Sequence, residues 1–239
     1  MTRINHDKII HNLLKEISPL GFGPPVTHVY NPLEYALEPY LQYLDRFGKG
    51  KKEVVLIGMN PGPWGMAQTG IPFGEVKSVK EWMLIIGPVG LPAKEHPARP
   101  VTGLSCTRSE VSGKRFWGWA NSRFKTPERF FARFFVANYC PLMFMEETGK
   151  NRTPNRLKAK EKAPLFKACD RALKATISLL EPEFVLGIGN FAADRARVAL
   201  TDMPVTLGKI THPSPANPSA NKGWEPLIEA ELAAQGIRL

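Results

Sequence analysis

The chain is poor in cysteine: Cys106, Cys140 and Cys169 are the only three among 239 residues, and no two of them form a CxxC pair. This spacing argues against a zinc ribbon or finger. Three thiols are also one short of the four that usually ligate an iron–sulfur cluster. We therefore expect no metal site, and a sparse, odd set of thiols is typical of a reducing compartment.

Long hydrophobic runs are missing as well. No stretch of about 18 apolar residues occurs, and residues 1–18 lack the apolar core of a signal peptide. We therefore expect an intracellular protein, cytoplasmic in a prokaryote and nuclear in a eukaryote, with no membrane partner.

Acidic residues are outnumbered. Lysine and arginine total 32 against 22 acids, which gives a formal charge of +10, and the pI is about 9.6. A surplus of this size is typical of a protein with a polyanionic partner, nucleic acid first, although it also serves solubility alone. The hydrophobic content of 43% is ordinary for a globular chain. We expect one domain over residues 1–239, large enough to bury a core.

Apolar periodicity predicts alternating helices and strands. Helical spacing occurs at 7–18, 33–46, 163–180, 191–200 and 225–236. Short apolar runs bounded by turn residues predict strands at 53–58, 134–139, 184–189 and 205–212. This alternation predicts an α/β fold whose parallel sheet carries helices on both faces. Ligands bind such sheets beyond the carboxyl ends of the strands, so the loops that follow them are candidate sites.

The first of these loops, residues 58–76, holds five glycines and three prolines. Glycine lets the backbone approach a ligand, and proline makes the loop rigid. The loop matches neither GxGxxG nor a P-loop, so we expect no nucleotide cofactor. Asn60 is its only strong hydrogen-bonding side chain at the strand exit, and the ring of Phe73 stands where it could face a ligand. Taken singly, a turn asparagine and a core phenylalanine are the simpler interpretations.

Two other strand exits carry polar side chains. Asn138 follows the second strand, and its amide has the donor and acceptor that match a nucleobase edge. His212 follows the last strand, before a loop rich in proline, asparagine and serine that ends near Lys222. This loop suits phosphate contact and insertion into a base stack. The other histidines are expected at the surface: His6, His11, His28 and His96.

Two basic stretches bear on the polyanion question. Residues 113–125 interleave four basic side chains with four aromatic ones, a pattern used in single-strand binding. The alternative is a helix that buries its aromatic rings and exposes its charges. Residues 150–162 hold six basic side chains and one acid. This run is either a solvated segment or the fringe of a DNA surface.

Four segments together resemble one family. Residues 58–76, 106–119, 134–142 and 212–225 resemble, in the same order, the signature segments of the single-strand-selective monofunctional uracil-DNA glycosylases. The resemblance runs from about residue 30 to the C-terminus. It implies a three-layer α/β/α sandwich around a short parallel sheet of about four strands. It also implies hydrolysis of the N-glycosidic bond of uracil in DNA, without a lyase step or a cofactor.

The resemblance also implies residue roles. Asn60 matches the asparagine that positions water, and His212 the histidine that stabilises charge at uracil O2. Asn138 matches the amide that reads the uracil edge, and Phe73 the ring that stacks on the base. Gly62 stands where the major uracil-DNA glycosylases have a tyrosine that excludes 5-methyl groups. This glycine makes 5-substituted uracils such as 5-hydroxymethyluracil plausible substrates.

The remaining expected contacts concern substrate and DNA. Further substrate-binding residues are Met59 and Met66, and the expected DNA-binding residues are Pro61, Pro63, Ser214, Pro215, Asn217 and Lys222. The chain has Ala216 where the family commonly has an arginine, which weakens the expectation for duplex binding and base extrusion. The expected partners are single- and double-stranded DNA containing uracil or related bases, bound by a monomer.

Two other functions remain open on sequence alone. A catalytically silent single-strand binder on the same scaffold would share the basic surface, but it would need neither Asn60 nor His212. A hydrolase of free nucleosides or nucleotides would use the same loops but has no use for a charge of +10. Both alternatives predict that DNA is left intact.

Overall fold

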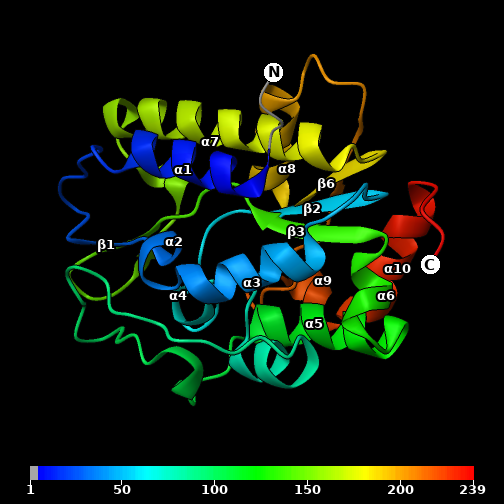
Figure 1. The fold of residues 1–239 in the computed structure, drawn as a ribbon, viewed down its shortest axis with the longest axis horizontal. Helices are drawn as coiled ribbons and strands as arrows, with labels where there is room; N and C mark the ends of the chain where they lie inside the picture. The colour runs from blue at the N-terminus through cyan, green and yellow to red at the C-terminus, as the bar shows by residue number, and fades with distance from the viewer. Residues whose placement is uncertain (1–4) are drawn as a thin grey trace.

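A four-stranded parallel sheet lies at the centre of the computed structural model, which describes residues 5–239 (Figure 1). Its strands are β2 (Val54–Gly58), β3 (Phe134–Asn138), β6 (Phe184–Ile188) and β7 (Thr206–Ile210), in the spatial order β3-β2-β6-β7. Every residue of β2 is buried, as expected for an apolar run in a central parallel strand. All four predicted strands are confirmed.

Helices cover both faces of this sheet (Figure 1). One layer contains α1 (His6–Ile17), α7 (Ala159–Leu180) and α8 (Asn190–Ala199). The other contains α3 (Leu37–Phe47), α5 (Val111–Phe124), α6 (Pro127–Phe131) and α10 (Trp224–Ala234). The expected three-layer α/β/α sandwich is confirmed.

The single helix predicted over 33–46 is wrong. The chain forms α2 (Pro32–Tyr35) and α3, separated at Ala36. Pro39, in the first turn of α3, has no N–H to donate to the carbonyl of Tyr35, four residues earlier. That carbonyl accepts the N–H of Gly90 instead, at 2.7 Å. The break therefore follows from the proline, and the carbonyl that it leaves free is hydrogen-bonded by a residue of a distant loop.

Helix α7 begins at Ala159, four residues before the predicted start. Glu161, in its first turn, accepts the backbone N–H of Lys158 at 3.2 Å and that of Gly23 at 2.9 Å. A first-turn carboxylate that satisfies free N–H groups stabilises the helix start. Pro164 consequently lies inside the helix.

A second, antiparallel sheet was not predicted. It consists of β1 (His28–Tyr30), β4 (Met143–Met145) and β5 (Asn151–Arg152), in the order β1-β4-β5. Strands of two or three residues are too short to show alternation. Strand β4 follows β3 closely in the chain, and its antiparallel pairing with β5 brings β5 to the carboxyl edge of the central sheet. The remaining short helices are α4 (Met66–Thr69), α9 (Pro218–Asn221), a π-helical turn (Ser78–Trp82) and 3₁₀ turns (Gly103–Ser105 and Pro154–Arg156).

The aromatic residues of α5 belong to the core. Phe116, Trp117 and Trp119 are each at most 1% exposed and pack with Phe130. The helix interpretation of residues 113–125 is therefore correct, and the single-strand-binding interpretation of these rings is wrong. The expectation of a surface His96 is also wrong, because this residue is 4% exposed. Its ring accepts the N–H of a neighbouring residue, a bond that makes burial of a polar ring tolerable.

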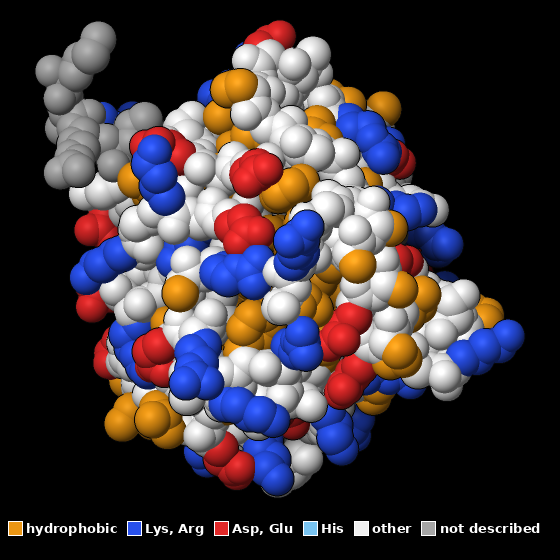
Figure 2. Space-filling view, turned by 90° about the vertical axis from the view of Figure 1, so that its right-hand side faces the viewer, with side chains coloured by type: hydrophobic (Ala, Val, Ile, Leu, Met, Phe, Trp, Pro, Cys, Tyr) orange, Lys and Arg blue, Asp and Glu red, His pale blue; other side chains and the backbone are white. Residues whose placement is uncertain are grey.

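The basic side chains do not form one continuous patch on the face that carries the C-terminus. There, lysine and arginine alternate with acidic side chains (Figure 2). Within residues 5–239, no helix combines the length and the apolar character that crossing a bilayer requires.

Candidate functional site

A cavity of about 280 Å³ lies at the carboxyl ends of the central strands. It is lined by Met59, Asn60, Gly62, Met66, Phe73, Glu110, Ser112, Asn138, Asn151, Thr153, His212 and Ser214. Three loops that are far apart in sequence thus meet in one place, as the parallel sheet predicts. The two expected catalytic residues and all five expected substrate-binding residues line this cavity. Glu110, Ser112, Asn151 and Thr153 were not foreseen.

Asn60 lies in the loop that follows β2. Its side-chain nitrogen donates to the carbonyl oxygen of Leu142 at 3.1 Å. This bond assigns the amide orientation, because only the nitrogen can donate to a carbonyl. The side-chain oxygen has no partner among the described residues, and Asn60 lines the cavity. Asn60 therefore offers the cavity a fixed, neutral hydrogen-bond acceptor.

His212 lies just beyond β7, and its protonation follows from its surroundings. The backbone N–H of Ser214 donates to Nδ1 at 3.1 Å. Burial lowers the pKa of His212 from 6.5 to about 4, since an imidazolium would lose its hydration. The ring is therefore neutral at pH 7. Because Nδ1 accepts, the ring proton lies on Nε2, and His212 offers the cavity a neutral donor.

The loop that carries His212 is anchored from both sides. The indole N–H of Trp224 donates to the Thr211 carbonyl at 2.8 Å. Arg115, on α5, donates to the carbonyl of Pro213 at 3.0 Å and to the side-chain oxygen of Asn221 at 2.9 Å. These bonds hold the residues on either side of His212, so little ordering of the imidazole is needed when a ligand binds.

Asn138 ends β3 and faces the loop that follows β2. Its side-chain nitrogen donates to Sδ of Met66 at 3.1 Å. A thioether is a weak acceptor, so this donor is available to a better partner. A Cβ on Gly58 would lie 2.3 Å from Oδ1 of Asn138 and 2.8 Å from the ring of Phe73. Glycine at position 58 therefore lets the amide and the ring approach the strand end closely.

Phe73 is held with φ at +54°, which is unusual for a residue with a side chain. Its carbonyl accepts the indole N–H of Trp117 at 3.0 Å, and its ring stacks on Phe116 at 5.3 Å. The ring centroid also lies 5.8 Å from that of His212. Phe73 is thus a rigid aromatic wall, backed by the core.

Glu110 lines the cavity next to the loop of residues 58–76, because a Cβ on Gly65 would lie 3.0 Å from its Cγ. Its carboxylate accepts the backbone N–H groups of Ser112 at 3.1 Å and Gly113 at 2.5 Å, and so caps α5. Burial raises the pKa of Glu110, while these two bonds oppose the rise. A Cβ on Gly62 would have only Cγ of Glu110 near it, at 4.0 Å. The cavity therefore has open space at position 62, as the resemblance implies.

Asn151 and Thr153 enter the cavity from β5 and the residue that follows it. The side-chain oxygen of Asn151 is buried and has no hydrogen-bond partner in the described part of the chain. In sequence, both residues lie within the basic run 150–162, where nothing marks them as site residues. Only the antiparallel pairing of β5 with β4 brings them to the site.

The expected DNA-binding residues are placed less uniformly. Ser214 lines the cavity, while Pro215 and Lys222 are exposed beside it on the His212 loop. Asn217 caps α9 by accepting the N–H of Ser219 at 3.1 Å. Pro63 is half-buried, and Pro61 is buried. The ring of Pro61 is therefore covered by the protein.

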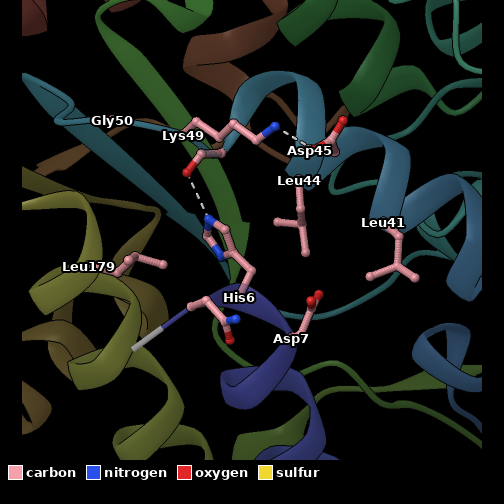
Figure 3. A pocket seen from close by; sticks show the side chains of 10 residues that line it. His6, Asp7, Leu41, Leu44, Asp45, Lys49, Gly50 and Leu179 are labelled. Atoms are coloured by element: carbon pink, nitrogen blue, oxygen red, sulfur yellow. Dashed lines mark hydrogen bonds and ion pairs between the residues drawn. The ribbon is translucent and has the colours of Figure 1, made fainter. Parts of the chain in front are cut away.

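A larger cavity, of about 510 Å³, lies between the start of α1 and the ends of α3 and α7 (Figure 3). It is at the opposite edge of the sheet, because its residue Gly50 precedes β2. Its polar groups are satisfied internally: the His6 ring bonds to the Gly48 carbonyl at 2.7 Å, and Lys49 pairs with Asp45 at 2.5 Å. It contains none of the predicted site residues.

The part of the chain that the structure describes contains no candidate metal-binding cluster. Across residues 5–239, no three His, Cys, Asp or Glu side chains are grouped as they would be around a metal ion.

Comparison with known proteins gives consistent results. Residues 45–231 match the family model of the uracil DNA glycosylase superfamily. The single-strand selective monofunctional uracil DNA glycosylase of Mus musculus is 47% identical over 224 residues, covering 93% of this chain and 80% of the mouse protein. The corresponding proteins of Rattus norvegicus and Bos taurus are 48% identical over the same length, with 81% and 82% of each covered.

Among solved structures, wild-type SMUG2 of Pedobacter heparinus has a similar fold, with a TM-score of 0.66. The match covers 95% of this chain and 97% of that one, at 17% identity. At this identity the likeness concerns the fold alone, and it agrees with the three-layer arrangement.

Proposed function

Since the chain belongs to the uracil DNA glycosylase superfamily, within its single-strand selective monofunctional group, we propose that it releases uracil from DNA. The reaction hydrolyses the N-glycosidic bond and leaves an abasic site, as in base-excision repair. The observation that carries this proposal is one cavity containing a free neutral acceptor, Asn60, and a free neutral donor, His212.

Uracil enters the cavity by leaving the base stack. A base within a duplex is out of reach, and extrusion costs a few kcal/mol, least for unpaired DNA. Phe73 then stacks on the extruded base, and the Asn138 amide bonds to the uracil edge through its donor and acceptor. Because Phe73 and Asn138 are already held by the core and by β3, little ordering cost accompanies binding.

Bond cleavage builds positive charge on the sugar and negative charge on the departing uracil. The Nε2 proton of His212 donates to uracil O2 and stabilises that negative charge. One preorganised donor of this kind contributes about 3–4 kcal/mol. A neutral imidazole suits the role because it keeps its proton and forms the stronger bond only as charge develops.

Water completes the reaction. The Asn60 oxygen accepts a hydrogen bond from water and so aims a lone pair at the sugar. A neutral amide has no useful proton affinity, so Asn60 orients the water without deprotonating it. The mechanism therefore depends on departure of the base as an anion, and water attacks the sugar late. The proton that the water loses balances the negative charge of the departed uracil.

A direct test uses end-labelled single- and double-stranded oligonucleotides that carry one uracil. We expect breakage at uracil after alkali, and none without alkali, because no lyase step occurs. An intact strand that is still bound would favour the silent binder. Release of base from free deoxyuridine, without release from DNA, would favour the nucleoside hydrolase.

Uracils substituted at C5, such as 5-hydroxymethyluracil, are proposed as further substrates because position 62 leaves space in the cavity. Gly62→Tyr should lower kcat/KM for 5-hydroxymethyluracil at least tenfold more than for uracil, since the ring fills that space. Gly62→Ala, which adds only a methyl group in open space, should change this ratio far less. Unchanged discrimination in the tyrosine variant would remove the assignment of this cavity wall.

The pH profile tests the protonation of His212. Because burial lowers its pKa to about 4, kcat/KM should stay level from pH 8 to about 5 and fall as pH approaches 4. A histidine at its ordinary pKa of 6.5 would instead lose its neutral form near pH 6. Burial also raises the pKa of Glu110, so the imidazole resonances of His212 should be followed by NMR to separate the two groups. A midpoint near 6.5, or a proton on Nδ1, would contradict the assigned tautomer.

We further propose that the protein acts as a monomer, inside the cell, on both single- and double-stranded DNA and without a membrane partner. All residues that line the cavity come from one chain, so the site needs no second copy. Sedimentation with and without an oligonucleotide would test the monomer.

A further inference from the structure

A cationic cluster lies beside the cavity, in residues that the mechanism does not use. The guanidinium of Arg108 lies 4.5 Å from the centroid of the Trp64 ring, and that of Arg99 lies 5.5 Å from the same centroid. We call these three residues the arginine–tryptophan rim. Such contacts hold a flexible arginine in place.

The rim adjoins the mouth of the cavity. Trp64 is two residues from Gly62, and Arg108 is two residues from Glu110, and both Gly62 and Glu110 line the cavity. Two residues span at most about 7 Å, so Trp64 and Arg108 lie within that reach of the lining. Arg108 is exposed, and Trp64 is half-buried. The rim is therefore accessible to a molecule that occupies the cavity and extends beyond it.

The two segments that bear Trp64 and Arg99 are fixed by one buried side chain. The nitrogen of Gln68 donates to the carbonyls of Pro63 and Pro100, at 2.9 Å each. Its oxygen accepts the N–H of Thr102, also at 2.9 Å. Gln68 is fully buried, so these bonds are shielded from water. The rim is thus held before any ligand binds.

Neither arginine of the rim has an ion-pair partner in the part of the chain that the structure describes. None of the ion pairs found among residues 5–239 involves Arg99 or Arg108. The nearby carboxylate of Glu110 is occupied in capping α5. In addition, Nε of Arg99 is buried without a hydrogen-bond partner. Both guanidiniums lie near one ring, so they are no more than about 10 Å apart, roughly one Debye length.

Two like charges gathered at this spacing, neither of them in an ion pair among the described residues, favour an anionic ligand. Guanidinium binds phosphate oxygens in a two-point geometry, and arginine is enriched where phosphate is recognised. The His212 loop, by contrast, carries Ala216 where an arginine could have reached a phosphate.

We propose that the arginine–tryptophan rim binds phosphates of the DNA strand that flank the extruded nucleotide, with Trp64 positioning the two arginines. The rim supplies positive charge beside the mouth of the cavity. This inference rests on the proposed function, since it takes DNA as the substrate.

The test compares Arg108→Gln and Arg99→Gln/Arg108→Gln with the wild type on a single-stranded 15-mer carrying one uracil. We expect KM to rise about three- to tenfold for the single variant and further for the double variant, with kcat little changed. The slope of log binding constant against log salt should become shallower by about 0.7 for each arginine lost. Arg197→Gln, on the exposed side of α8, is the matched control and should leave both quantities unchanged.

Variants of Trp64 separate charge from positioning. Trp64→Ala should raise KM about as much as Arg108→Gln, and Trp64→Phe should recover most of the loss, because a phenyl ring still holds a guanidinium. On a strand whose two phosphates flanking the uracil nucleotide are replaced by neutral methylphosphonates, all rim variants should approach the wild type.

The outcomes distinguish the rim from the proposed function. If the wild-type protein releases no uracil from any strand, the proposed function fails. If the wild type releases uracil and the rim variants show wild-type KM and salt slope, the rim inference is overturned. A fall in kcat at unchanged KM would also overturn it, because the rim would then be shaping the cavity. Thermal unfolding should confirm that each variant is folded.

Discussion

Replacing Asn60 by alanine will abolish nearly all uracil release and leave DNA binding within about twofold of the wild type. The side-chain oxygen of Asn60 is the acceptor that aims water at the sugar, and no described neighbour occupies it. Without this acceptor the water is unoriented, and we expect the single-turnover rate to fall by about 1,000-fold or more. Binding depends instead on the stacking wall, the uracil-reading amide and phosphate contacts, which this change does not touch.

The measurement is single-turnover release from a labelled strand, together with fluorescence anisotropy for binding on the same strand. Asn60→Ala also removes the hydrogen bond to Leu142, so the free energy of unfolding must be compared. Loss of one such bond costs about 1 kcal/mol, which a folded domain of this size tolerates. An equal loss of binding and release would indicate that Asn60 is structural.

Replacing His212 by leucine will slow uracil release by about 100- to 1,000-fold, because a single preorganised donor to a developing anion contributes about 3–4 kcal/mol. His212→Asn keeps a neutral N–H donor, although a shorter one, and should recover part of the loss. His212→Leu also removes the acceptor for the N–H of Ser214, whereas the side-chain oxygen of asparagine retains an acceptor there, so the free energy of unfolding of both variants must be compared.

The departing base supplies a sharper readout for His212. A 5-fluoro substituent withdraws electrons and stabilises the uracil anion, so it lessens the need for a donor at O2. The loss in His212→Leu should therefore be several-fold smaller for 5-fluorouracil than for uracil. Asn60→Ala should show no such difference, because Asn60 acts on the water. An equal loss for both bases in the leucine variant would count against a role for His212 at the leaving group.

The sequence predicted correctly those features that depend on neighbouring residues alone. Four apolar runs predicted the four parallel strands, and the polar residue at three of their exits predicted Asn60, Asn138 and His212 as cavity residues. This succeeded because buried parallel strands are continuous apolar runs and their carboxyl ends share one edge.

Local pattern failed where a distant partner decides the outcome. The helix expected over 33–46 is broken because Pro39 has no N–H to donate to the Tyr35 carbonyl. The N–H of Gly90 donates to that carbonyl instead. The aromatic residues of α5 could have served a nucleic acid or the core, and burial by α6 and β3 assigned them to the core.

By itself, the sequence determined the strand order along the chain, the residue types available for catalysis and the family resemblance. Only the tertiary structure decided that His212 is neutral, because its pKa depends on burial by segments far away in sequence. It also brought Glu110 and Asn151 to the cavity and set two arginines beside Trp64. Desolvation, antiparallel pairing of very short strands and unbalanced charge are properties of a three-dimensional arrangement, and no window of neighbouring residues contains them.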